Sequence, residues 1–151
     1  MSADAMAVRF SDWITLDAAR VRAFAEVTDD WQAIHLDEAF AAETPFGGTV
    51  AHGFLTLSML SAMSYQVTAE DAPSGMSVNY GFDRIRFVTP VRVGSRIRGR
   101  FELEDETRGA TFTDRHWDVS VEIDGAARPA LVAHWITRIY DEDASDAARA
   151  G

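Results

Sequence analysis

The hydrophobic and polar positions of the first fifty residues predict short helices separated by turns. Apolar residues recur at helical spacing from about 17 to 28, and Asp17 is of a type preferred at helix N-caps. Residues 28–35 break this period and predict a turn. A short helix is expected over 37–43, before proline and glycines mark a loop at 45–48.

The strongest helical pattern covers residues 52–67. Apolar residues occupy nearly every side of this segment: Phe54, Leu55, Leu57, Met59, Leu60, Ala62 and Met63. A helix that is apolar all round is expected to be buried all round. In a chain of 151 residues, another element must therefore wrap around it.

The second half of the chain supplies that element. Four segments alternate in strand fashion, at 77–89, 94–104, 111–123 and 128–140. Asp124-Gly125 predicts a two-residue hairpin turn between the last two strands, and Val8–Leu16 is expected to add an edge strand. The pattern predicts an α+β protein in which an antiparallel sheet wraps a long central helix, the hot-dog arrangement. We expect one domain over 1–151, with 142–151 as a frayed tail.

Charge and composition exclude several classes of function. The net charge of −10 argues against nucleic-acid binding through overall charge, because phosphate contacts need a positive surface. The chain has no cysteine, which excludes thiolate metal sites and cysteine nucleophiles. The uncharged stretch Thr44–Ala69 is interrupted by Pro, Gly and His, so its apolar part is too short to cross a bilayer. With no apolar run at the start, we expect a cytoplasmic protein.

Two segments carry candidate chemistry, at 28–35 and 49–58. Asp30 and His35 lie five residues apart across the predicted turn, so a carboxylate and an imidazole could share one water. Gly53 starts the long helix, where backbone N–H groups can polarise a carbonyl. Spacing alone favours the structural interpretation, in which Asp30 caps a local turn and Gly53 only begins a helix. The other histidines are expected to be structural or surface residues: His52, His116 and His134.

Resemblance to a known family changes this balance. The first segment resembles the hydratase motif of the MaoC-like family, which reads Gly-Asp-x-Asn-Pro-aliphatic-His and is matched by Asp30, Ile34 and His35. Ala51-His52-Gly53 resembles the start of that family's central helix. Nearly the whole chain is similar to the NodN-like subgroup. The segments that carry this similarity are Asp12-Trp13, Thr49–Ser58, Val78–Gly81, Arg84–Phe87 and Pro90–Ser95.

The resemblance implies a lyase of fatty acid metabolism, an (R)-specific 2-enoyl-CoA hydratase or dehydratase. Asp30 and His35 would be the catalytic dyad, and the Gly53 N–H would be the oxyanion donor. Residues implied for the substrate pocket are Gln32, Ser61 and Asn79, with Ser61 placed near the dyad. The implied substrate is a CoA or acyl-carrier thioester, and neither a metal nor a cofactor is expected. A homodimer joined edge to edge is implied, with the acyl tunnel near its interface.

The motif is not fully kept. The family glycine before the aspartate is Asp29, and the Asn-Pro pair is Gln32-Ala33, a site where the NodN-like subgroup also tends to carry Gln. Two other functions therefore stay open. A hot-dog thioesterase would polarise the same carbonyl, and a non-catalytic acyl-thioester binding protein would keep the fold without the reaction.

Arginines gather in one stretch of this acidic chain. All 14 basic residues are Arg, and the stretch 84–100 holds six of them without an Asp or Glu. Arg96, Arg98 and Arg100 should share one strand face, as should Arg84 and Arg86. One interpretation is a solvated face balanced by acids elsewhere. The other is that Arg84 and Arg86 meet the CoA phosphates, since Arg binds phosphate in a bidentate fork.

Overall fold

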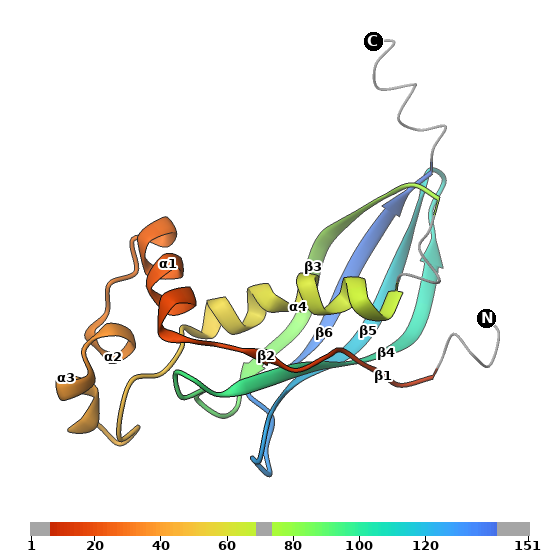
Figure 1. Ribbon diagram of the computed structural model, residues 1–151. Coiled ribbons are helices and arrows are strands. Elements are labelled where there is room, and N and C mark those ends of the chain that lie inside the picture. The colour runs from red at the N-terminus through yellow and green to blue at the C-terminus, as the bar shows by residue number, and fades with distance from the viewer. Residues whose placement is uncertain (1–6, 69–73, 142–151) are drawn as a thin grey trace.

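The computed structural model describes residues 7–68 and 74–141, which form one antiparallel sheet packed against a long helix (Figure 1). Its strands are β1 (Arg9–Phe10), β2 (Ile14–Thr15), β3 (Met76–Phe87), β4 (Arg96–Arg108), β5 (Phe112–Ile123) and β6 (Leu131–Tyr140). The order across the sheet is β1-β4-β5-β6-β3, and β2 also pairs with β4. Among the described residues, β3 pairs only with β6, so its other side forms an open edge of the sheet.

Four helices accompany the sheet within the same residues. They are α1 (Ala18–Thr28), α2 (Ala33–Leu36), α3 (Glu38–Ala42) and α4 (Gly53–Thr68). The predicted cap is confirmed, because the Asp17 carboxylate accepts the Arg20 N–H at 2.8 Å. In Figure 1, α4 lies against the sheet, while α1, α2 and α3 form a group beyond the start of α4. This arrangement brings the turn between α1 and α2 to the N-terminal end of α4.

The core lies between one side of α4 and the inner face of the sheet. From α4 it takes four residues at helical spacing: Leu55, Met59, Leu60 and Met63. From β4, β5 and β6 it takes alternate residues of each strand: Ile97, Phe101, Val119, Val121, Leu131, Ala133 and Trp135. The strand pattern of the sequence therefore predicted the buried face correctly.

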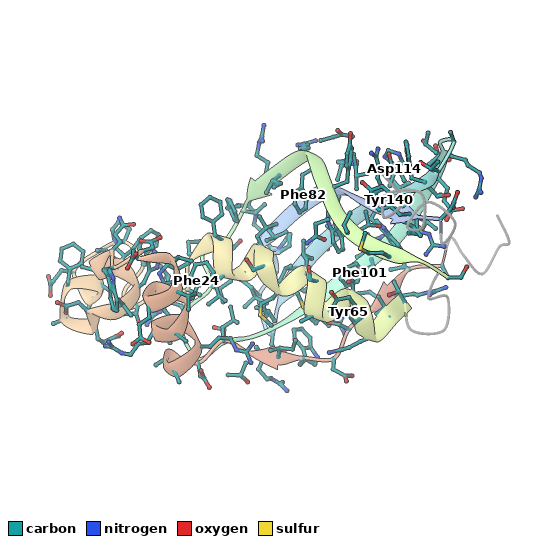
Figure 2. All side chains as sticks on the ribbon, turned by 90° about the horizontal axis from the view of Figure 1, so that it is seen from above. Phe24, Tyr65, Phe82, Phe101, Asp114 and Tyr140 are labelled. Atoms are coloured by element: carbon teal, nitrogen blue, oxygen red, sulfur yellow. The ribbon has the colours of Figure 1, made fainter. Side chains whose placement is uncertain are left out.

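The expectation that α4 is buried all round is wrong for the single chain. A stripe along its far side is exposed, with Phe54 at 65% and Tyr65 at 72% of their full accessibility. Figure 2 shows Tyr65 near the end of α4, and Phe24 lies beside its start. The physical reason is that the sheet covers only one side of the helix. The open edge strand β3 adds further exposed apolar side chains: Met76, Tyr80 and Phe87.

Other expectations for the fold have mixed outcomes. The segment Val8–Leu16 does add to the sheet, as the two short strands β1 and β2 along β4. Gly125 has the positive φ of a turn residue, at 77°, but β6 starts only at Leu131, so the predicted two-residue hairpin is part of a longer loop. The expected frayed tail, 142–151, lies outside the described residues. No helix within the described part of the chain has the length and apolar character needed to cross a membrane.

Candidate functional site

The turn that carries Asp30 starts from a left-handed residue. Asp29 ends α1 with φ 56° and ψ 25°, which is the left-handed region that favours glycine and tolerates Asp. The left-handed conformation gives a physical reason for the glycine at this position of the MaoC-like hydratase motif. In this chain, Asp29 adopts the same conformation in place of glycine. Asp30 follows, partly buried, and its carboxylate lies 3.5 Å from the Gln32 N–H. The turn therefore points the Asp30 side chain inward while Gln32 stays exposed.

His35 is buried on the short helix α2 and has one ring nitrogen fixed. Its Nδ1 lies 2.6 Å from the carbonyl oxygen of Val50. A carbonyl only accepts, so Nδ1 carries the hydrogen and the Nε2 lone pair stays available in the neutral ring. Burial lowers the pKa of His35 below its ordinary value of 6.5. The Val50 carbonyl opposes that shift, His52 adds to it, and the Asp30 charge opposes it. His35 is therefore held neutral at pH 7.

His52 joins the turn of Asp30 to the start of α4. Its Nε2 donates to the backbone carbonyl of Asp30 at 3.0 Å, and its ring stacks on that of His35 with centroids 3.9 Å apart. The Phe24 ring packs on it as well, at 4.9 Å between centroids. His52 is 2% exposed, and its Nδ1 has no hydrogen-bond partner among the described residues. This residue was expected to be structural or on the surface; it is structural, and it supports both residues of the expected dyad.

The structure brings the two expected dyad residues together. Asp30, His35 and His52 each offer one carboxylate oxygen or ring nitrogen, and these atoms lie within 4.8 Å of one another. Such a set has the ligand types of a metal site. The same distances let a single water contact both Asp30 and His35. One nitrogen of each imidazole is already engaged with a backbone carbonyl, which leaves Nε2 of His35 for the shared water.

Gly53 begins α4 directly after His52. The first N–H groups of a helix lack acceptors within the helix and carry the positive end of its dipole. A Cβ at Gly53 would stand 3.1 Å from the ring of Phe87, closer than most side-chain contacts. The Phe87 ring therefore packs where a side chain would begin, which accounts for glycine at this exposed helix start.

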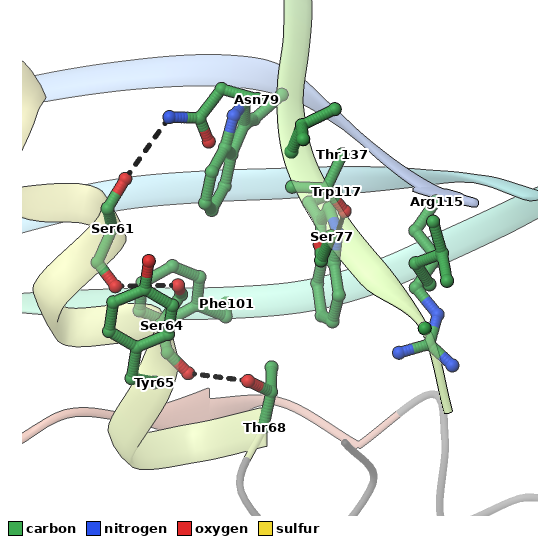
Figure 3. A pocket seen from close by; sticks show the side chains of 14 residues that line it. Ser61, Ser64, Tyr65, Thr68, Ser77, Asn79, Phe101, Arg115, Trp117 and Thr137 are labelled. Carbon is green, nitrogen blue, oxygen red and sulfur yellow. Dashed lines mark hydrogen bonds between the residues drawn. The ribbon is translucent and has the colours of Figure 1, made fainter. Parts of the chain in front are cut away.

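The expected pocket residues do not all lie at the dyad. Ser61 and Asn79 meet, since the Asn79 amide donates to Ser61 Oγ at 3.3 Å (Figure 3). They line a pocket of about 280 Å³ between the second half of α4, β3 and the inner face of the sheet. Ser61 comes eight residues after Gly53, which is about 12 Å along the helix axis at 1.5 Å per residue. Within one chain, Ser61 is therefore separated from the dyad, and Gln32 belongs to the dyad turn instead.

The arginines of the stretch 84–100 divide into two groups. Arg96, Arg98 and Arg100 share one face as predicted, and each pairs with a carboxylate of β5 or of the loop after it: Asp124, Glu122 and Asp118, respectively. Arg100 also pairs with Glu102 of its own strand. Those three are thus a balanced surface network. Arg84 and Arg86 are exposed on the edge strand β3, and no carboxylate within residues 7–68 and 74–141 pairs with them. Arg86 precedes Phe87, whose ring lies against Gly53.

Two features of the site escaped sequence reasoning. The supporting role of His52 depends on a ring stack across 17 residues of sequence, and only its place before Gly53 could have hinted at it. The polar pocket is built from α4 and all four long strands, so no single segment shows it.

Comparison with known proteins places this geometry in a family. The sequence profile of the MaoC like domain matches residues 2–125. The chain is 50% identical to nodulation protein N of Rhizobium leguminosarum bv. viciae over 131 residues, covering 85% of this chain and 81% of that protein. It is 40% identical to 3-hydroxyacyl-thioester dehydratase Z of Mycobacterium tuberculosis over 129 residues, covering 85% of each.

A solved structure agrees with the sequence relatives. The (R)-hydratase from A. caviae superposes with a TM-score of 0.74 at 25% identity, covering 91% of this chain and 98% of that one. The hot-dog arrangement and the resemblance to the NodN-like subgroup are both confirmed. The chain belongs to the MaoC-like domain family.

Proposed function

We propose that this protein adds water reversibly to trans-2-enoyl thioesters and gives (3R)-hydroxyacyl thioesters. The observation that carries the proposal is the meeting of Asp30 and His35 beside the start of α4. Relatives with hydratase or dehydratase names support the same class of reaction: 3-hydroxyacyl-thioester dehydratase Z of Mycobacterium tuberculosis and (R)-specific enoyl-CoA hydratase of Aeromonas caviae. Hydration needs a held water, a base for its proton and an acid for C2 of the substrate.

In this proposal, His35 acts as the base. The Val50 carbonyl fixes its tautomer, so Nε2 can take a proton from the water as the water oxygen attacks C3. Its lowered pKa keeps the ring neutral, which a base requires. The Asp30 carboxylate holds the second hydrogen of the same water, and the dyad returns a proton to C2. Because both new bonds form on the side of the dyad, the addition is syn.

The helix start supplies the electrostatic part. Negative charge develops on the thioester oxygen as the enolate forms, and a backbone N–H at the positive end of α4 stabilises it. We assign this donor to Gly53, because it is exposed at the helix start directly after His52, which stacks on His35 of the dyad. This role alone would serve a thioesterase equally well. The dyad distinguishes the hydratase.

The direct test uses crotonyl-CoA with two readouts. Hydration lowers the ultraviolet absorbance of the conjugated double bond without releasing a thiol, and chiral analysis of the product should show the (3R) isomer. Release of free CoA would indicate a thioesterase instead. Binding of the thioester without either reaction would indicate a non-catalytic acyl-thioester protein.

We further propose that two copies pair through β3 and the exposed stripe of α4. An open edge strand is normally paired or covered, and the exposed Phe54 and Tyr65 form an apolar stripe on α4. A two-fold axis perpendicular to the sheet runs the two α4 helices in opposite directions. The pocket with Ser61 in one protomer would then approach the dyad of its partner, which would account for their separation within one chain.

Tyr65→Arg tests this dimer, because it places a charge on the exposed stripe of α4. We expect a monomer in light scattering and a large loss of activity. Val27→Arg is the matched control, since Val27 is 81% exposed on α1, outside this surface. A fully active wild-type monomer at low concentration would contradict the proposal.

Arg84 and Arg86 remain our candidates for the CoA phosphates. They lack carboxylate partners among the described residues, so their charges are available to phosphates, although Arg86 Nη1 also donates to the Ile85 carbonyl at 2.7 Å. Arg84→Ala or Arg86→Ala should raise KM for the CoA ester and leave kcat nearly unchanged. The effect should vanish with a pantetheine thioester, which lacks the nucleotide phosphates. Arg128→Ala, in the exposed loop before β6, is the control.

A further inference from the structure

The pocket beyond the middle of α4 is polar on several sides. The face of α4 that meets the core is built from Leu and Met, yet the part that lines the pocket carries hydroxyl groups. The hydroxyl and amide side chains of the lining are Ser61, Ser64, Tyr65, Thr68, Ser77, Asn79 and Thr137. Ser64 and Thr68 donate to helix carbonyls at 2.8 and 2.9 Å, so their oxygens can serve a ligand only as acceptors (Figure 3).

Two tryptophans of the lining differ in how their N–H groups are satisfied. The Trp117 N–H donates to Thr137 Oγ1 at 3.0 Å. Trp135 is 3% exposed, and its N–H has no acceptor among the described residues. A buried donor left unpaired costs about 1–3 kcal/mol. The Trp135 indole is therefore a donor that lacks an acceptor, in a side chain that lines the pocket.

Among the described residues that line the pocket, the one charged side chain, Arg115, is already neutralised. Its Nε donates to Glu106 at 2.7 Å, and the pair is largely shielded from solvent. The part of the lining that the structure describes therefore offers hydrogen bonds without a free positive charge. A neutral oxygen group fits this lining better than a carboxylate, which would need an unpaired cation.

We infer that this pocket binds the acyl chain of the substrate and selects chains that carry a neutral oxygen group, a hydroxyl or a keto group, away from the thioester. This inference rests on the proposed hydratase function. The oxygen accepts from the Trp135 N–H, and a hydroxyl can also donate to the Ser and Thr oxygens. The volume of about 280 Å³ holds about nine water-sized groups, which is enough for the distal part of an acyl chain.

The experiment compares 2-enoyl-CoA substrates of equal chain length, with and without one hydroxyl or keto group near the end of the chain. Wild type should give the higher kcat/KM with the oxygenated member of a pair. Trp135→Phe removes the donor and keeps an aromatic ring, so this preference should fall about 5- to 10-fold, the value of one hydrogen bond. The kcat/KM for the all-carbon substrate should fall much less in this variant.

Two further variants separate binding from packing. Ser64→Ala removes a second polar group at a small cost in volume and should reduce the same preference. Trp13→Phe is the matched control, because Trp13 contacts Arg96 and Arg98 away from the pocket. This variant should keep the wild-type kcat/KM for both substrates. A preference for the all-carbon chain in wild type would overturn the inference. So would equal losses on both substrates in Trp135→Phe.

Failure of the proposed function gives a different result. Calorimetry with saturated acyl-CoA pairs measures the preference of the pocket without any reaction. Selective binding of the oxygenated chain with no turnover would keep the pocket assignment and reject the hydratase. Turnover of crotonyl-CoA with a preference for all-carbon chains would support the hydratase and reject the pocket assignment.

Discussion

Replacing His52 by phenylalanine isolates one contact of the site. The new ring keeps the packing between Phe24 and His35, which lie 4.9 and 3.9 Å from the His52 centroid. What disappears is the N–H that donates to the carbonyl of Asp30 at 3.0 Å. That hydrogen bond links the turn that carries Asp30 to His52, the residue directly before α4. We therefore expect the turn to loosen while the fold persists.

The magnitudes separate stability from catalysis. The Asp30 carbonyl loses a donor, which costs about 1–3 kcal/mol for a buried group. The same change removes the buried and unpaired Nδ1 of His52, which returns a similar amount, so Tm should change by no more than about 4 °C. A displacement of the dyad by even 1 Å can cost about 100-fold in rate. We predict a loss of about 10- to 100-fold in kcat.

The assay is crotonyl-CoA hydration together with thermal unfolding of the same samples. Phe24→Leu is the control, because Phe24 packs on His52 without touching the Asp30 carbonyl; it should lower Tm and leave kcat near that of wild type. A His52→Phe variant with full activity would refute the positioning role and leave His52 as a packing residue.

Three further predictions concern the dyad turn. The pKa of His35 is lowered from 6.5 in the folded protein, so the unfolded chain binds more protons below that pH. The unfolding free energy should therefore fall as the pH drops below 6.5. His35→Gln should weaken this pH dependence, as measured by denaturation at several pH values. Asp29→Gly should raise Tm by about 2–4 °C with activity kept, since glycine relieves the left-handed backbone. Ala33→Pro should raise the unfolding free energy by about 0.4–1 kcal/mol in urea denaturation. Ala33 is the first residue of α2, and Gln32 before it has a ψ of 131°, which suits a residue that precedes proline. A loss of stability in Asp29→Gly or in Ala33→Pro would contradict this account of the turn.

Alternation and helical spacing were enough to predict most of the fold. The cap at Asp17, the limits of α1 and α4, and the inner faces of the long strands follow from local patterns. The exposed side of α4 did not follow. An apolar stripe looks the same in the sequence whether a sheet or a second copy of the chain covers it, and within one chain the sheet reaches only the opposite side.

The candidate site was predictable where it is local in sequence. Asp30 and His35 span one turn, and Gly53 stands at a helix start, so motif and spacing located all three. Ser61 was placed near the dyad by resemblance, whereas the rise of α4 carries it away within one chain. The stacking of His52 on His35 and the unpaired Trp135 N–H depend on packing between distant segments, which no local pattern encodes.

The central claim is that Asp30 and His35 activate water for addition to an enoyl thioester. The most direct measurement is the rate of crotonyl-CoA hydration by wild type, Asp30→Asn and His35→Gln, with circular dichroism to verify that each variant is folded. Both substitutions keep the side-chain size and remove a base, so each should lower kcat by about 10²- to 10⁴-fold. Near-wild-type turnover by either folded variant would contradict the assignment of the dyad.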